Sequence, residues 1–166
     1  ANDTAVRRLF DLKGRDAAAA IALIAADAAQ AEHAGQFGPI ERRLATAFWP
    51  GPLTIVVPAA DTLSRLLAPR GTLGVRVPAH TVTRDLCRAS GRVLTATSAN
   101  LTGRPASNDP DAIAASLAQL IDVLLDAGTT QGGLPSTIVD VSGPAPVLVR
   151  QGAVPWDKVE SSWRPH

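Results

Sequence analysis

Short apolar runs alternate with amphipathic segments along this chain, and stretches rich in glycine and proline separate them. The runs "LTIVVP" and "LGVRVP" contain many β-branched residues, which is typical of strands. Runs of this kind predict strands over 21–25, 53–58, 73–78, 92–96, 121–126, 136–141 and 146–150. Because the strands alternate with helical patterns, the sequence predicts an α/β fold with a mixed sheet.

Helical spacing of apolar residues predicts the intervening helices, over 2–13, 27–35, 39–49 and 81–90. A further helix is predicted from Asp109 or Asp111 onward, and its apolar positions include Ile113, Leu117 and Leu120. Asn2 or Asp3 would cap the first helix, which would end at Gly14. Gly35 would lie near the end of the second, and Pro39 stands in a favoured first-turn position of the third.

Size and composition predict one soluble globular domain over residues 1–166. The chain is 46% hydrophobic and 19% charged, enough apolar material for a sizeable core. A net charge of +1 provides no global field for nucleic acid or an anionic membrane. The longest apolar stretch, 17–29, contains Asp27 and is too short to span a membrane. The single cysteine excludes an internal disulfide and suits a reducing cytosol, so we expect a cytoplasmic protein.

The familiar catalytic and metal-binding patterns are absent from the sequence. His33, His80 and His166 are scattered, and there is no cysteine pair, GxSxG segment or Gly-rich Walker segment, so no protein metal site is expected. The remaining polar groups stand at expected strand ends and turns, where α/β sheets bind ligands. These candidates are Lys13, Arg15, Thr72, Arg76, Ser98, Asn100, Ser136 and Arg150.

Each candidate also has a purely structural interpretation. Lys13 and Arg15 could bind phosphate, or could offset the carbonyl charge at a helix C-terminus. Arg76 lies inside an expected strand, where it either faces solvent or meets an anionic partner. Ser98 and Asn100 could orient a polyphosphate or carboxylate, or could only satisfy the backbone of a turn. Ser136 and Arg150 could likewise bind a ligand or have only structural roles, Ser136 as a hydroxyl at the start of a strand and Arg150 as an exposed cation at the end of one.

Six ordered segments nevertheless resemble one known family. They are "LFDLKGR", "FWPGPLTIVVPA", "GVRVPAH", "TSANLTGRPAS", "GLPSTIVDV" and "LVRQGAV". Together they resemble the YrdC-like proteins, including TsaC-type threonylcarbamoyl-AMP synthases. The resemblance covers nearly the whole chain, and it implies a twisted open mixed sheet with flanking helices and a concave, positively lined cavity.

The resemblance also implies an activity. Such enzymes form L-threonylcarbamoyladenylate and pyrophosphate from ATP, L-threonine and bicarbonate or CO2, with Mg2+ bound to the phosphates. The product serves the threonylcarbamoyl modification of adenosine 37 in tRNA, so the implied partners include the downstream transfer proteins and tRNA or double-stranded RNA. By motif, Lys13, Arg15, Ser98 and Asn100 would be catalytic and surround the phosphates. Thr72 and Arg150 would also contact ATP, while Arg76 and Ser136 would bind threonine.

The chain departs from the family pattern near its start. Family members generally carry a P-T-[DE]-T-V-Y-G-L segment before the first matched helix, and nothing here corresponds to it. With no Met in the sequence, we expect a chain truncated at its N-terminus that lacks an initial strand or two. Two other functions stay open: an RNA-binding module without synthase activity and a YciO-like paralogue.

Overall fold

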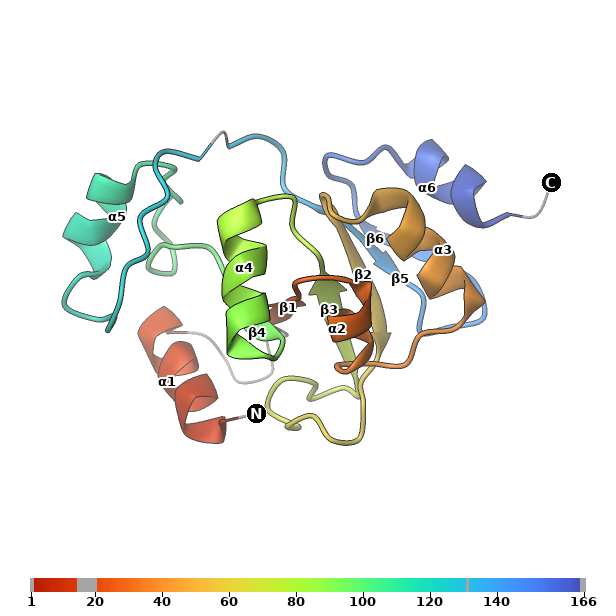
Figure 1. The fold of residues 1–166 in the computed structure, drawn as a ribbon, viewed down its shortest axis with the longest axis horizontal. Helices are drawn as coiled ribbons and strands as arrows, with labels where there is room; N and C mark the ends of the chain where they lie inside the picture. The colour runs from red at the N-terminus through yellow and green to blue at the C-terminus, as the bar shows by residue number, and fades with distance from the viewer. Residues whose placement is uncertain (1, 15–20, 131, 165–166) are drawn as a thin grey trace. The chain divides into compact units, whose positions relative to one another are not determined.

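The computed structural model describes residues 2–14, 21–130 and 132–164, which form two compact units. Unit 1 comprises residues 1–19 and 97–133, and unit 2 comprises 20–96 and 134–166. Figure 1 labels their helices and strands along the chain. Unit 1 contains α1 (Asp3–Lys13) and α5 (Pro110–Leu117). The expectation of a single domain stays a prediction.

The described strands all belong to unit 2 and form one six-stranded mixed sheet in the order β4-β1-β3-β2-β5-β6. Their bounds are β1 Ala22–Ile24, β2 Leu53–Pro58, β3 Thr72–Arg76, β4 Leu94–Ala96, β5 Thr137–Asp140 and β6 Val147–Arg150. The β1/β3 and β2/β5 pairs are parallel, and the other neighbours are antiparallel. The mixed α/β sheet with flanking helices predicted from the sequence is thereby confirmed.

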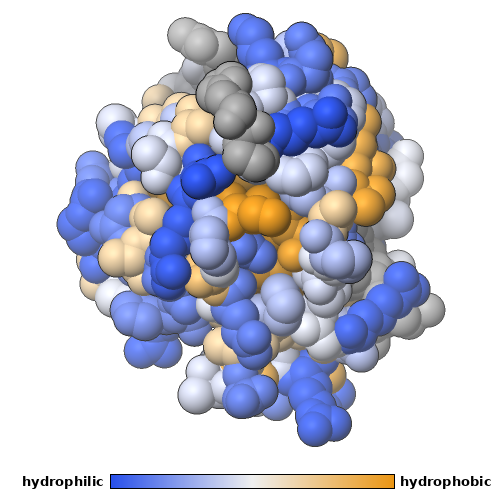
Figure 2. All heavy atoms as spheres, turned by 90° about the vertical axis from the view of Figure 1, so that its right-hand side faces the viewer, coloured by the Kyte–Doolittle hydropathy of each residue, from blue (hydrophilic) through white to orange (hydrophobic). Residues whose placement is uncertain are grey.

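One face of this sheet forms the core of unit 2. Leu53, Ile55 and Val57 of β2 are fully buried, and Val75 and Val139 extend the same layer across β3 and β5. The helices of this unit in the described ranges are α2 (Ala28–Glu32), α3 (Pro39–Phe48), α4 (Thr81–Ser90) and α6 (Trp156–Trp163). Helix α3 packs against β2 and against α6. Figure 2 looks onto the side where α3 and α6 lie and shows a mostly hydrophilic surface around a smaller apolar area.

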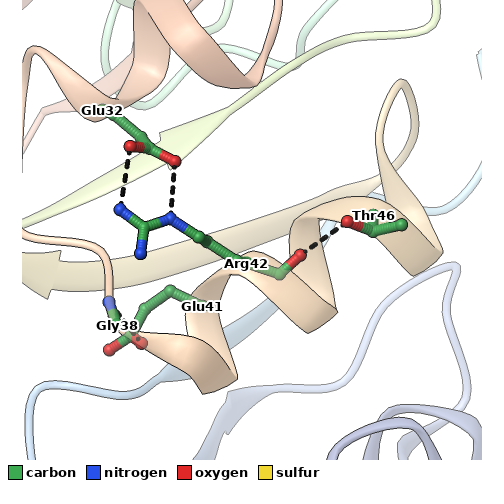
Figure 3. Close-up of polar contacts among 5 residues, drawn as sticks. All are labelled: Glu32, Gly38, Glu41, Arg42 and Thr46. Atoms are coloured by element: carbon green, nitrogen blue, oxygen red, sulfur yellow. Dashed lines mark hydrogen bonds and ion pairs between the residues drawn. The ribbon is translucent and has the colours of Figure 1, made fainter.

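Side-chain contacts at its N-terminus explain where α3 begins. Gly38 is the N-cap, and the Glu41 carboxylate accepts a hydrogen bond from its backbone N–H at 2.9 Å. Arg42, one residue further, donates to both carboxylate oxygens of Glu32 at 3.0 and 3.1 Å, which ties α3 to the end of α2 (Figure 3). The Thr46 hydroxyl donates to the Arg42 carbonyl. Pro39 occupies the first turn, as the sequence predicts.

Most sequence predictions of secondary structure are confirmed, and the differences are local. Residues 121–126 are not a strand, and Val123 and Leu125 are 73% and 59% exposed. Helix α2 ends at Glu32 with His33 as its C-cap, so Gly35 lies beyond the end of the helix. Gly35 instead forms an isolated antiparallel β-bridge with Ala59. Helix α6 was not expected at all. Helix α5 stops at Leu117, which leaves Leu120 outside it.

None of the helices in the part of the chain that the structure describes has the length and apolar character needed to cross a membrane.

Candidate functional site

The face of the sheet opposite the core carries the polar candidates of unit 2. Along β3, Leu73 and Val75 are buried, whereas Thr72, Gly74 and Arg76 alternate with them and are half-buried. Directly paired residues of neighbouring strands share a face, so the pairs Thr54–Ile138 and Ile138–Arg150 extend this surface across β2, β5 and β6. The strand pairing therefore brings together residues that lie far apart in the sequence.

Arg76 and Arg150 form the most unusual electrostatic feature of this face. Burial lowers the pKa of the Arg76 guanidinium, and the positive charge of Arg150 lowers it further. A guanidinium stays protonated at neutral pH despite such shifts, so two like charges act on one another here. Neither arginine forms an ion pair with an acidic side chain in the described parts of the chain. An anionic ligand is the partner that would offset both charges.

Ser136, directly before β5, joins this pair. The Arg150 Nη2 donates to the Ser136 carbonyl oxygen at 2.7 Å and to its Oγ at 3.3 Å. The Ser136 Oγ also lies 2.9 Å from the Oγ1 of Thr54. Gly152 permits this arrangement, because a Cβ there would come within 2.2 Å of the Pro135 carbonyl oxygen. A hydroxyl and a guanidinium are thus fixed side by side, as recognition of a carboxylate or phosphate requires.

Lys13 is the central group of the candidate site in unit 1. It ends α1, and only 3% of its surface is exposed. Its Nζ donates to the Ser98 carbonyl oxygen at 3.0 Å, to the Asn100 Oδ1 at 3.0 Å and to the Asn100 carbonyl oxygen. The Thr102 hydroxyl donates to the Lys13 carbonyl oxygen. The ammonium group therefore holds the 98–102 loop to the end of the helix.

Ser98 and Asn100 have the turn role that the sequence leaves open, and their ligand-binding role stays a prediction. The Ser98 hydroxyl donates to the Asn100 Oδ1 at 2.5 Å, and the Asn100 Nδ2 donates to the Arg104 carbonyl oxygen. The backbone N–H of Asn100 donates to the Ser98 carbonyl oxygen, so these residues do form a turn. At the same time Ser98 is exposed and Asn100 is half-exposed, which leaves hydroxyl and amide groups accessible to a ligand.

The structure thus assembles the candidates in two groups. In unit 1, the Lys13 side chain contacts Ser98 and Asn100. In unit 2, Arg150 donates a hydrogen bond to Ser136, and the positive charge of Arg150 lowers the pKa of Arg76. Thr72 shares the face of Arg76 on β3. Arg15 lies outside the described residues. No group of three or more His, Cys, Asp or Glu side chains suited to a metal ion occurs in the described ranges.

Comparison with known proteins identifies the family. The Sua5_yciO_yrdC family model, described as "Telomere recombination", matches residues 1–152. This chain belongs to the Sua5/YciO/YrdC family. Its relatives include the threonylcarbamoyl-AMP synthase of Pyrococcus abyssi, which is 35% identical over 161 residues and is matched over 96% of this chain and 47% of that protein. The synthase of Idiomarina loihiensis is 35% identical over 143 residues, with coverage of 84% and 77%.

A solved structure supports the same assignment. The crystal structure of P. abyssi Sua5 complexed with L-threonine superposes with a TM-score of 0.89 at 35% identity. The match covers 99% of this Sua5/YciO/YrdC chain and 50% of that one. The chain therefore spans about half the length of the Pyrococcus proteins that it matches.

Two side chains at these sites were missed by the sequence reasoning. Thr54 is a buried hydroxyl within the apolar run "LTIVVP", and that isolated polar residue is the signal that could have marked it. Thr102 follows the S-x-N residues and binds the end of α1. Hydroxyl residues are so common in loops that the sequence offers no comparable signal for Thr102.

Proposed function

We propose that this protein is an L-threonylcarbamoyladenylate synthase, which uses ATP, L-threonine and bicarbonate or CO2. The observation that carries the proposal is Arg76, which shares a face of the sheet with Arg150 and is affected by its charge, while Arg150 donates to the Ser136 hydroxyl. A partly desolvated guanidinium, a second, exposed guanidinium and a fixed hydroxyl suit a small anionic substrate. The threonine complex of P. abyssi Sua5 and the names of the relatives indicate which substrate that is.

In the proposed reaction the threonine amine first combines with bicarbonate or CO2 to give a carbamate. A carbamate oxygen then attacks the α-phosphorus of ATP, the bond to the bridging oxygen breaks, and pyrophosphate leaves. With bicarbonate as the carbon source, one water molecule is released. No protein nucleophile is needed, so the protein contributes positioning and charge stabilisation.

The residues have distinct roles in this proposal. Arg76 and Ser136 hold the threonine carboxylate, and Arg150 and Thr72 contact ATP. Ser98 and Asn100, together with Arg15, bind the phosphates, and Lys13 completes this catalytic group from behind the loop. Ser98 and Asn100 offer the phosphates their hydroxyl and amide groups, and the Lys13 ammonium holds the loop that presents them.

Mg2+ is proposed as an ion that arrives with ATP. The described residues offer amide, hydroxyl and cationic groups rather than a cluster of carboxylates, which fits an ion held chiefly by phosphate oxygens. When bound, such an ion neutralises charge on the phosphates and on the leaving pyrophosphate.

The proposal is tested by threonine-dependent adenylate chemistry. The chain is incubated with ATP, Mg2+ and bicarbonate, and pyrophosphate release is measured with and without L-threonine. Release that requires both threonine and bicarbonate is expected, and Arg76→Met should lower it by about 100-fold, the scale of losing one preorganised charged contact. Arg70→Met removes an exposed arginine of the same unit and should match the wild type. Wild-type turnover in Arg76→Met would refute the assigned role.

The cellular setting follows from the same proposal. The adenylate would pass to proteins that transfer the threonylcarbamoyl group to tRNA, and the compartment would be the cytoplasm. Titration with tRNA at two salt concentrations separates the synthase from an RNA-binding module. Tight, steeply salt-dependent RNA binding without threonine-dependent pyrophosphate release would favour the module.

A further inference from the structure

Thr54 is a buried polar side chain whose position suggests a function. It is 5% exposed and belongs to a small set of buried polar residues in the described chain, with Lys13 and Thr137. Thr137 is engaged structurally, because its hydroxyl donates to the Val154 carbonyl oxygen and accepts from two backbone N–H groups. The hydroxyl of Thr54 instead contacts the Ser136 Oγ. A buried hydroxyl is therefore directed at the candidate ligand-binding serine.

Packing fixes the direction of that hydroxyl. In the parallel pairing of β2 with β5, Thr54 lies opposite Ile138, and Ser136 is two residues earlier on the same face. On its other side, the Thr54 methyl carbon lies against Gly74, where a Cβ would come within 3.0 Å of it. Threonine has a stiff χ1, so a methyl directed towards Gly74 leaves the hydroxyl directed towards Ser136.

The hydrogen bonds around Ser136 limit where its proton can point. The Arg150 Nη2 donates to the Ser136 Oγ and can only be a donor. If Thr54 also donates, both acceptor positions of the Ser136 oxygen are filled. The Ser136 hydroxyl proton is then left to bond an acceptor outside this network, such as a ligand carboxylate.

We propose that Thr54 is a positioning residue that fixes the Ser136 side chain in one rotamer, in which its hydroxyl is offered to the anionic group of the ligand. This inference rests on the proposed function for the identity of that ligand, L-threonine. It assigns Thr54 no contact with the ligand. Its effect on binding must therefore pass through Ser136.

The test uses the full chain with Thr54→Val, Thr54→Ser, Ser136→Ala and the Thr54→Val/Ser136→Ala double variant. Valine keeps the shape of threonine without its hydroxyl, and serine keeps the hydroxyl without the methyl. Without ligand, NMR couplings between Hα and Hβ report the Ser136 rotamer. Titration calorimetry then gives the affinity for L-threonine. Thermal unfolding of each variant verifies folding.

We expect one Ser136 rotamer in the wild type and in Thr54→Ser, and rotamer averaging in Thr54→Val. Threonine affinity should fall by about 2- to 12-fold in Thr54→Val, the equivalent of one hydrogen bond, and recover in Thr54→Ser. In the Ser136→Ala background, Thr54→Val should have no further effect, because the group that Thr54 orients is already missing.

Two results would overturn the inference: an unchanged Ser136 rotamer in Thr54→Val, or an equal loss of affinity from Thr54→Val with and without Ser136. Failure of the wild-type chain to bind threonine is a different result. It would count against threonine as the ligand of this chain, whereas the ligand-free rotamer measurement would still decide whether Thr54 positions Ser136.

Discussion

At the scale of single residues, Arg76 shows a conflict between stability and binding. Its guanidinium is partly desolvated and feels the like charge of Arg150, and both effects oppose folding. Such unfavourable placement is common where a ligand supplies the missing charge. The residue therefore makes physical sense as part of a binding site and little sense as part of a scaffold.

Arg76→Met is expected to raise the free energy of unfolding by about 0.5–2 kcal/mol while strongly weakening threonine binding. The substitution removes the like-charge contact and the desolvated charge but keeps an apolar side chain of similar length. Urea unfolding and threonine titration measure the two effects. Arg70→Met, at an exposed position of the same unit, should change neither. A loss of stability in Arg76→Met would show that the guanidinium supports the fold.

Lys13 has the opposite character. Its ammonium is buried against oxygens of Ser98 and Asn100, so the fold itself depends on it. Lys13→Met should lower the free energy of unfolding by about 1–3 kcal/mol, since it leaves part-buried carbonyl oxygens without their lysine donor. Chemical denaturation measures the change.

Lys158→Met provides the matched control, because Lys158 is exposed on α6 and is the other lysine of the chain. An equal effect of both substitutions would contradict the role of Lys13. An unchanged stability of Lys13→Met would contradict it as well.

At the scale of elements, the ion pair between Glu32 and Arg42 links α2 to α3 (Figure 3). The hydrogen bond from Arg42 lowers the pKa of Glu32, burial opposes this, and the charge of Arg42 adds to the lowering. A depressed carboxyl pKa stabilises the fold above the unfolded-state pKa, which is about 4.3 for glutamate. That stabilisation is lost as the pH falls through the lower pKa of the folded state.

Glu32→Gln should therefore have a lower urea midpoint than the wild type at pH 7, and the difference should vanish as the pH falls below about 4. The effect should be small, because Arg42 is exposed and the Glu32 side chain is still 36% exposed. Asp61→Asn removes an exposed carboxylate that forms no ion pair with the described residues and should lack this pH dependence. A difference that persists unchanged at pH 3 would rule out the ion pair as its source.

The elements that sequence reasoning identified correctly are those with local signals. Strands β2 and β3 carry β-branched runs, and α1 has its N-cap and terminal glycine in the predicted places. Residues 121–126 have an equally apolar run, but a strand needs a hydrogen-bonded neighbour, which the run itself does not reveal. Helix α6 was missed although Trp156, Val159 and Trp163 recur at helical spacing, because its N-cap, Pro155, has no side-chain capping bond.

The candidate site was also predictable only where local sequence signals mark its residues. Ser136 and Arg150 stand near strand ends, where binding residues are expected, and their contact bridges adjacent strands of one sheet. The bond from Thr54 to Ser136 depends on the pairing of β2 with β5, across 82 residues of sequence. Burial and charge at Arg76 likewise arise only in the assembled sheet.

At the scale of the whole molecule, the two units differ in how much of their backbone is protected. Unit 2 contains the sheet, whose central strands are fully buried on one face. In unit 1, the backbone N–H groups of residues 122–126 form no hydrogen bonds with backbone groups of the described chain, and Val123 and Leu125 are exposed. The backbone amides of the two units should therefore exchange their hydrogens with solvent at different rates.

Hydrogen exchange followed by mass spectrometry should find the slowest amides in β2, β3 and β5, and exchange within seconds over 122–126. The physical reason is that amide exchange requires a broken hydrogen bond and solvent access, and both conditions are already met in residues 122–126. Helix α4, which is hydrogen-bonded but carries exposed side chains, provides an intermediate reference. Protection of 122–126 equal to that of β2 would contradict this expectation.

The position of β2 between β3 and β5 has a consequence for the synthesis of this protein. Its β3 neighbour follows closely in the sequence, but about 80 residues separate the end of β2 from the start of β5. At a translation rate of roughly 5–20 residues per second, the ribosome needs about 4–16 s to make that stretch. During this interval a strand destined for the centre of the sheet has an open edge, so the nascent chain passes through a period in which it can associate with other unfinished chains.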